Sequence, residues 1–272
     1  MNTLPTDGAS ENRAAFKKLA TLTARSIFLG YCNDDDLEGL PFKVAFPHPS
    51  PVYSKDITIF IGGEMPHWVK KVRNAFDSKA QKLEFRGKWM SLAMCDDVWK
   101  QTTDASMQKG NLRKYKFGKE HFQLNSYNKM QVFLAMQIFS QTMIRMLTVH
   151  CDSTDANIGD YDPMMEIFNA VDWLIDIMNA TSFKNGKHTQ VRHINSPVHP
   201  NIFELFAILR LFEEWKEEAG GFNEKYITKY TYEDLVWMVF GLAGVAYCYL
   251  DVDGSKKCIN VAAALMFVNI FL

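Results

Sequence analysis

Two groups of polar side chains in this sequence have types and spacings suited to chemistry. In the first, Glu64 follows two glycines and precedes the segment MPHWVKKVRNAFD. In the second, LIDIMNA, Asp176 and Asn179 are three residues apart within an apolar stretch. Carboxylates can hold divalent metal ions or accept hydrogen bonds from the N–H groups of a base. Both groups are therefore candidate sites.

Glu64 is a candidate catalytic and metal-binding carboxylate. The preceding DITIFIGG is a β-branched run closed by two glycines, which predicts a buried strand that ends beside Glu64. Active sites of α/β folds often lie at this edge of a sheet. A nuclease that binds two Mg²⁺ ions about 3.5–4 Å apart needs several such carboxylates. The alternative is that Glu64 only stabilises the N-terminus of the following helix, with His67 structural.

The segment after Glu64 predicts an amphipathic helix with a basic face. Apolar residues recur at three- and four-residue steps and predict a buried stripe: Trp68, Val69, Val72, Ala75 and Phe76. Lys70, Lys71 and Arg73 are expected to point away from that stripe. Basic side chains of this kind contact phosphates, so these three are candidate DNA-binding residues, with a solvated face as the alternative.

Asp176 and Asn179 share one face of a predicted apolar helix, where polar groups need partners. A carboxylate can accept hydrogen bonds from both N1–H and N2–H₂ of guanine, whereas N1 of adenine presents a lone pair. The alternative is a hydrogen bond between helices. The chain has no GxxxxGK[ST] or Rossmann glycine motif, so a bound nucleotide would be held without a P-loop.

The composition indicates a folded chain with no global basic field. Its 272 residues are 47% hydrophobic, and 30 Lys and Arg oppose 31 Asp and Glu, giving a net charge of -1. Five scattered cysteines without CxxC spacing predict a reducing intracellular compartment. The apolar C-terminal run INVAAALMFVNIFL is shorter than the roughly 18 residues that span a bilayer, so no membrane association is expected.

The elements that would position these residues are mainly helices after a small region with strands. Residues 1–40 predict a polar N-terminal segment, and the periodicity changes to helical near residues 80–88. Long helices are predicted over 129–147, 164–183 and 201–221, the last ending on Gly-Gly. A further helix is expected to begin with Thr231 as N-cap and Asp234 at N3.

The order of these motifs resembles that of P-element-type DNA transposases. The resemblance covers roughly residues 40–250 and is carried by four segments: EMPHWVKKVRNAF, HFQLNSYNKMQVFLAMQIFS, LIDIMNATSF and YITKYTYEDLVWMVFGLAGVAYCYL. In that family a ribonuclease-H-like catalytic core is interrupted by a helical GTP-binding insertion domain.

The resemblance implies a mainly α, overall α+β protein with four parts: a polar segment over 1–40, a partial ribonuclease-H-like core over 41–85, a helical GTP-binding insertion-like domain over 88–250, and a divergent apolar tail over 251–272. It places Glu64 at the second catalytic acidic position. It also places Asp176 and Asn179 in the guanine-recognition motif and Lys129 in a KM motif near the nucleotide. GTP, Mg²⁺, transposon-end DNA, a homo-oligomer and the nucleus are the implied cofactors, partners and compartment.

The sequence departs from the family pattern at two of these positions. Glu64 stands where the family has Asp, and Ile175 stands where the guanine motif has Phe. The first catalytic acid is not identified, because residues 1–40 do not resemble two ribonuclease-H strands. The third is not identified either, because an unrelated apolar run follows LDVDGSKKC, and Asp251 and Asp253 are not expected to replace it. The expected function is therefore that of a transposase fragment that binds a guanine nucleotide and is catalytically incomplete by itself. The alternative is a transposon-derived structural or interaction protein without enzymatic activity.

Overall fold

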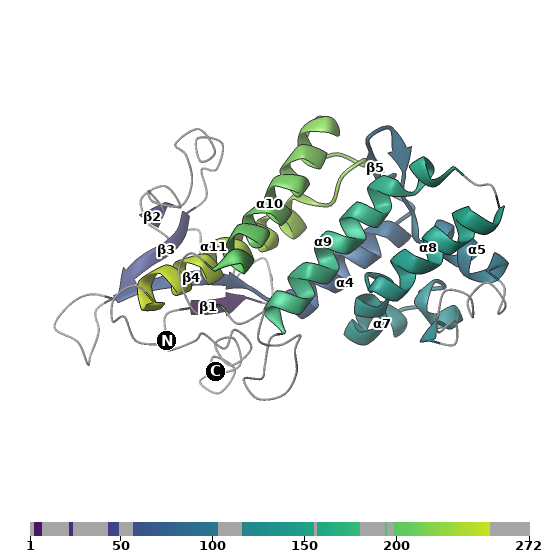
Figure 1. Ribbon diagram of the computed structural model, residues 1–272. Helices are drawn as coiled ribbons and strands as arrows, with labels where there is room; N and C mark the ends of the chain where they lie inside the picture. The colour runs from purple at the N-terminus through teal and green to yellow at the C-terminus, as the bar shows by residue number, and fades with distance from the viewer. Residues whose placement is uncertain are drawn as a thin grey trace. The chain divides into compact units, whose positions relative to one another are not determined.

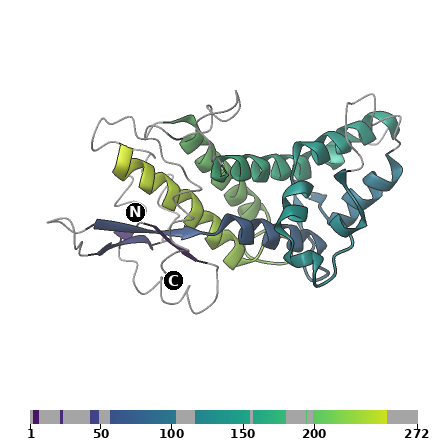
Figure 2. The same ribbon diagram turned by 90° about the horizontal axis from the view of Figure 1, so that it is seen from below.

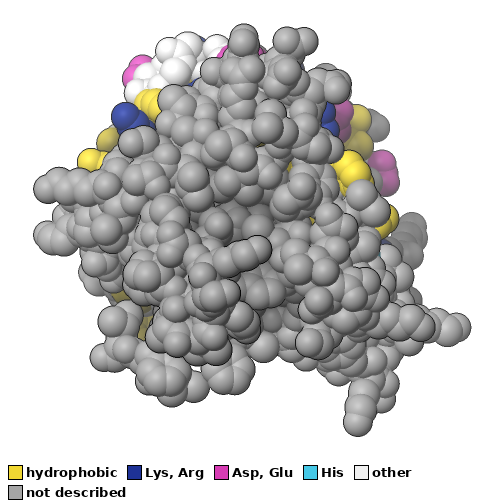
Figure 3. Space-filling view, turned by 90° about the vertical axis from the view of Figure 1, so that its left-hand side faces the viewer, with side chains coloured by type: hydrophobic (Ala, Val, Ile, Leu, Met, Phe, Trp, Pro, Cys, Tyr) yellow, Lys and Arg dark blue, Asp and Glu magenta, His cyan; other side chains and the backbone are white. Residues whose placement is uncertain are grey.

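The structure is a computed structural model that describes the protein as a mainly helical chain with a small sheet (Figure 1). It describes residues 3–6, 22–23, 43–48, 57–102, 116–154, 157–179, 194 and 199–250. Most of the surface visible in Figure 3 belongs to residues outside these ranges. The chain forms two compact units: the first comprises residues 1–65, 176–209 and 233–272, and the second comprises 66–175 and 210–232.

The first unit contains a four-stranded sheet in the order β1-β4-β3-β2. Its strands are β1 (Thr3–Thr6), β2 (Leu22–Thr23), β3 (Lys43–His48) and β4 (Ile57–Gly63). The pair β1–β4 is parallel with Thr6 opposite Gly63, whereas β3 pairs antiparallel with both β4 and β2. The predicted strand before Glu64 is thus confirmed, and it lies between two neighbours in the sheet.

Two of these strands lie in the segment expected to be only a polar N-terminal region. That expectation is wrong for Thr3–Thr6 and Leu22–Thr23, which form β1 and β2. Both are too short to show a two-residue hydrophobic period, and their pairing partners are distant in sequence. The remainder of residues 1–40 lies outside the described ranges.

Helix α4 (Met65–Asp77) runs through the interior of the second unit from Pro66 onward (Figures 1 and 2). All five residues of the predicted apolar stripe are buried: Trp68, Val69, Val72, Ala75 and Phe76. Phe76 makes edge contacts with Phe139 at 6.2 Å and Phe168 at 5.4 Å, and these two rings lie 5.1 Å apart. This aromatic cluster joins three segments that are far apart in the sequence.

The helices around α4 differ in one respect from the prediction. The continuous helix expected over 129–147 is wrong, because the chain forms η3 (Asn128–Met130), α7 (Val132–Ile138) and α8 (Gln141–Thr154). The break occurs at Ser140, whose hydroxyl donates to the carbonyl of Gln137 at 2.7 Å and competes with the helical hydrogen bonds.

One described stretch, Val132–Asp152, is long and apolar enough to cross a membrane by length and composition alone. Core helices of folded domains meet the same criterion. Several of its apolar side chains are buried inside the second unit: Ala135, Ile138, Phe139, Met143, Met146 and Leu147. Their burial is what a core position requires.

The remaining elements of the second unit are short or lie on its outside. A hairpin of β5 (Glu84–Phe85) and β6 (Lys88–Trp89) turns through Arg86 and Gly87, which have φ of 50° and 69° as a type I′ turn requires. Three further elements are α5 (Leu92–Gln101), capped by Ser91, η2 (Lys119–His121) and η4 (Ile158–Asp160). Helix α5 packs on α8, as Figure 1 shows.

Three further helices are the longest in the described part of the chain. They are α9 (Asp162–Met178), α10 (Pro200–Glu218) and α11 (Lys229–Leu250). The predicted Gly-Gly stop is confirmed, because Gly220 and Gly221 have φ of 75° and 105°. The predicted N-cap at Thr231 is wrong: α11 begins earlier, where the Thr228 hydroxyl accepts from the Thr231 N–H at 3.3 Å.

The two chain segments that make up the second unit are hydrogen-bonded to each other. Backbone N–H groups of Lys82 and Glu84 donate to the carbonyls of Glu224 at 2.6 Å and Lys225 at 3.0 Å. The indole N–H of Trp215, a fully buried residue, donates to the carbonyls of Glu84 at 2.8 Å and Lys225 at 3.2 Å. The second unit is therefore closed at the point where its discontinuous segments meet.

We expect Trp215→Phe to lower the free energy of unfolding by about 1–3 kcal/mol, because the buried indole no longer donates to two partly buried carbonyls. Urea denaturation of the full chain measures this change. Trp89→Phe is the matched control, since Trp89 is 53% exposed and should shift stability by about 0.5 kcal/mol or less. Equal losses in the two variants would show that the indole does not hold the segments together.

Candidate functional site

Glu64 lies where the sequence predicts it, between β4 and α4, and is half-buried. Within the part of the chain that the structure describes, no group of three or more His, Cys, Asp or Glu side chains could hold a metal ion. A single carboxylate does not make the two-metal site of a nuclease. The described residues therefore do not fit a Mg²⁺ centre, and the catalytic and metal-binding roles of Glu64 stay predictions.

The basic side chains of α4 are not equally exposed. The prediction that all three point away from the core is wrong for Arg73 and Lys70, whose exposed fractions are 0% and 8%; Lys71 is half-buried. An amphipathic pattern identifies the apolar side of a helix, but other segments of the unit also cover the polar side of α4. Contact with DNA phosphates stays a prediction for these residues, with Lys71 the most accessible of the three.

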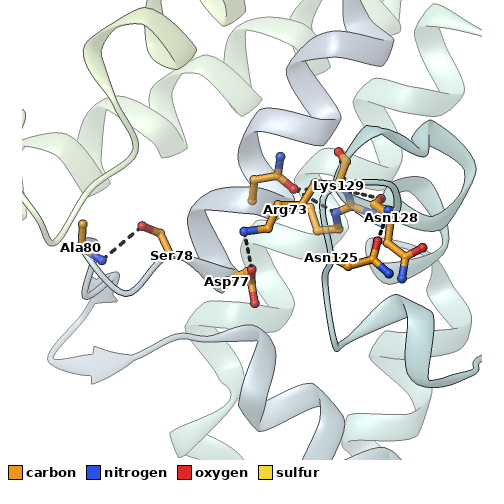
Figure 4. Close-up of polar contacts among 8 residues, drawn as sticks. Arg73, Asp77, Ser78, Ala80, Asn125, Asn128 and Lys129 are labelled. Atoms are coloured by element: carbon orange, nitrogen blue, oxygen red, sulfur yellow. Dashed lines mark hydrogen bonds and ion pairs between the residues drawn. The ribbon is translucent and has the colours of Figure 1, made fainter.

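The guanidinium of Arg73 is surrounded by acceptors from a loop over residues 125–131, here called the Lys129 loop (Figure 4). Its Nη2 donates to the carbonyls of Asn128 at 3.0 Å and Lys129 at 2.9 Å, and its Nη1 to that of Gln131 at 3.4 Å. Asn74 Oδ1 accepts from Nη2 at 3.1 Å and Nε at 3.3 Å. This one side chain thus fixes the backbone of the loop.

The charge of Arg73 is retained despite burial. Burial lowers the pKa of Arg73 to about 10, and the nearby Asp77 carboxylate acts in the opposite direction. The guanidinium therefore remains a cation at neutral pH. Hydrogen bonds from a charged donor are about twice as strong as neutral ones, which makes this contact a strong anchor for the loop.

Lys129 lies on η3 with its ammonium directed to α4 (Figure 4). Its Nζ is 3.1 Å from Asp77 Oδ2, and its side chain is 43% exposed. Asn125 Oδ1 accepts from the Asn128 N–H at 2.8 Å and closes the turn that precedes Lys129. A half-exposed lysine on a fixed turn can reach an anionic group in solution while its backbone stays in place.

Asp176 and Asn179 lie in the last turn of α9 and just after it. Asp176 is half-buried and Asn179 is exposed, whereas Ile175 beside them is 7% exposed. Only Asp176 lies within the helix, so Asn179 does not meet the prediction that both residues share one face of an apolar helix. These two residues belong to the first compact unit, whereas Lys129 belongs to the second.

His121 and Gln137, both within the quoted family-like segment, serve the fold. The backbone N–H of Gly118 donates to His121 Nδ1 at 3.0 Å, and His121 Nε2 is 2.6 Å from Gln137 Oε1. Because Nδ1 accepts, we assign the ring proton to Nε2, which donates to the amide oxygen. Both side chains are buried, so this pair joins η2 to α7.

Sequence reasoning missed Asp77 and Asn74 as parts of this arrangement. Arg73 and Asp77 are four residues apart and therefore share a helix face, which was the available signal. Their acceptors and partners come from the Lys129 loop, more than fifty positions along the chain. No local pattern reports a contact over that separation.

Comparison with known proteins matches this architecture to one class. Residues 66–191 match the model of a family described as the TNP-like, GTP-binding insertion domain. No curated protein matches the sequence. This part of the chain is thus similar to insertion domains of the TNP-like type.

The more particular likeness is to the P element. The fold is similar to a solved structure titled Drosophila P element transposase strand transfer complex, with a TM-score of 0.70 and 17% sequence identity. The match covers 99% of this chain and 53% of that chain, so this chain spans about half the length of the transposase. The P-element-type resemblance and the mainly α fold are confirmed.

Because Lys71 and Arg73 differ in burial, their replacement is expected to lower the free energy of unfolding by different amounts. We expect Arg73→Ala to lower the free energy of unfolding by about 2 kcal/mol more than Lys71→Ala, because it removes the charged hydrogen bonds of a buried guanidinium to three carbonyls. Chemical denaturation of the full chain tests this. Equal effects would contradict the anchoring of the Lys129 loop by Arg73.

Proposed function

We propose that this chain is the nucleotide-binding portion of a P-element-type DNA transposase, and that it binds a guanine nucleotide. The observation that supports this most is the match of residues 66–191 to a GTP-binding insertion domain. The similarity of the whole chain to the P element transposase fold is consistent with it. DNA is then the partner of the complete protein, and the nucleus its place of action.

Base recognition is assigned to Asp176, with Asn179 beside it. A half-buried carboxylate at the end of α9 can accept from guanine N1–H and N2–H₂ while the rest of the base remains accessible. Each charge-assisted hydrogen bond contributes about 1.5–3 kcal/mol. Adenine cannot supply this pair of donors, so the carboxylate would select against it.

Phosphate binding is assigned to Lys129. Its backbone is fixed by Arg73, and its half-exposed ammonium supplies a positive charge without a P-loop. Lysine binds phosphate as a point charge, which needs no special loop conformation. A Mg²⁺ ion would add further charge compensation, but the described residues do not identify ligands for it.

DNA cleavage would require more than this chain's described residues offer. Glu64 directly follows the end of strand β4. Strand transfer by metal-activated attack needs additional carboxylates around it. We infer that Glu64 contributes to such a centre only within the complete transposase. Lys71 is the candidate phosphate contact on α4, and a homo-oligomer is the proposed assembly on transposon ends.

The base-recognition proposal predicts a change of specificity. Asp176→Asn should weaken GTP binding about ten- to a hundredfold, because one charged acceptor pair is lost. The asparagine amide can instead donate to O2 of xanthine and accept from its N1–H, so the variant should bind XTP better than GTP. Equilibrium titration of the full chain with fluorescent GTP and XTP measures both changes.

Asp172→Asn is the matched control on the same helix. Asp172 lies one turn earlier on α9, where its Oδ2 accepts from Gln141 Nε2 at 3.0 Å. This variant should bind GTP as the natural chain does and should not gain XTP binding. GTP binding that is equal in the Asp176→Asn and natural chains would remove Asp176 from the proposal. Failure of the natural chain to bind GTP at millimolar concentration would refute the proposed function.

A further inference from the structure

The contacts around the Lys129 loop indicate how the candidate phosphate-binding lysine is controlled. Helix α4 holds this loop at two points, one on its backbone and one on the Lys129 side chain (Figure 4). Arg73 and Asp77 provide these two points from one face of α4, four residues apart. The contact of Arg73 with the loop backbone would be enough to anchor the loop, so the contact of Asp77 with Lys129 needs a separate explanation.

The backbone contact sets the position of the loop. Arg73 is fully buried and donates to the carbonyls of Asn128, Lys129 and Gln131. The carbonyls of Asn128 and Gln131 also accept from the backbone N–H groups of Gln131 at 3.1 Å and Ala135 at 3.4 Å, and a planar guanidinium can donate to several carbonyls at once. A lysine at position 73 carries the same charge but lacks the fork geometry needed for three carbonyls and Asn74.

The side-chain contact occupies the ammonium that a phosphate would need. Asp77 Oδ2 lies 3.1 Å from Lys129 Nζ, and the Asp77 and Lys129 side chains are 24% and 43% exposed. A nucleotide phosphate placed at this ammonium would also approach the Asp77 carboxylate, and like charges repel. Asp77 and a phosphate therefore compete for one cation.

We propose that α4 acts as a resting-state clamp on the phosphate-binding lysine, with Arg73 positioning the Lys129 loop and Asp77 holding the ammonium until a nucleotide phosphate replaces it. This inference rests on the proposed function, which assigns Lys129 to the phosphates. Arg73 and Asp77 are positioning residues in this proposal, which assigns a nucleotide contact to neither of them. The clamp makes nucleotide affinity depend on residues of α4 that lie outside the binding contacts.

The side-chain contact is tested on the nucleotide-free full chain by pulse acylation of lysines and mass spectrometry. Asp77→Asn should raise the acylation rate of Lys129 about two- to fivefold, the range that a partly exposed ion pair accounts for. Lys225 is an internal reference, since its Nζ is also 3.1 Å from a carboxylate, Glu84, and its side chain is also 43% exposed. Its rate should not change.

The GTP affinity of the same variant distinguishes two roles of Asp77: competing with the phosphate for Lys129, or orienting Lys129 towards the phosphate. Asp77→Asn should bind GTP about two- to fivefold more tightly, because the competing charge is removed while an acceptor for Lys129 remains. Weaker or unchanged GTP binding, or an unchanged Lys129 acylation rate, would overturn the clamp at Asp77. The variant changes one partly exposed group, so loss of folding does not obscure the result.

The backbone contact is tested by comparing variants within α4. Arg73→Met should weaken GTP binding at least about fivefold and increase deuterium exchange in the Lys129 loop, because the loop loses its main anchor. Arg73→Lys should restore part of both properties. Trp68→Phe is the control: it removes a buried bond to the Thr231 carbonyl, 2.9 Å long, without touching the loop.

Trp68→Phe should lower Tm while its GTP affinity stays within about twofold of that of the natural chain. If Arg73→Met and Trp68→Phe weaken GTP binding equally, Arg73 acts only through stability and the proposal is overturned. If neither the natural chain nor any of the variants binds GTP, the proposed function fails. The acylation and exchange results then still decide whether the clamp exists.

Discussion

The buried charge of Arg73 determines much of the arrangement around it, because a guanidinium removed from water must be given several acceptors. Here those acceptors are backbone carbonyls of the Lys129 loop, which cannot move away from α4 without leaving the cation unsatisfied. Phe76, one turn further along α4, contacts Phe139 at the end of α7 and Phe168 within α9 through its ring. The position of the loop is thus a consequence of how α4 is buried.

Local sequence patterns predicted the elements that are long and periodic. The apolar stripe of α4, the strand before Glu64 and the glycine stop after α10 each depend on neighbouring residues, and each is confirmed. The patterns did not predict β1 and β2, whose pairing is long-range, or the break at Ser140, where a hydroxyl competes with the helix. The pairing of β1 and β2 depends on contacts outside a short window, whereas the Ser140 contact with Gln137 is local but is not reported by hydrophobic periodicity.

The candidate site was predictable only in its individual residues. The motif order identified Lys129, Asp176 and Asn179, but periodicity treated Arg73 as a surface cation. Whether a basic side chain on a helix faces solvent depends on what packs over it, and here the Lys129 loop does so. His121 and Gln137 illustrate the same point, since residues within a family-like motif can serve the fold instead of the ligand.

The central claim is that Lys129, held by α4, lies beside the phosphates of a bound guanine nucleotide. The most direct measurement uses an acyl-phosphate derivative of GTP, which transfers its acyl group to a lysine next to the phosphates, followed by mass spectrometry of the full chain. The account predicts labelling of Lys129 that excess GTP suppresses and ATP does not. Labelling that is confined to other lysines, or that ATP suppresses equally, would contradict it.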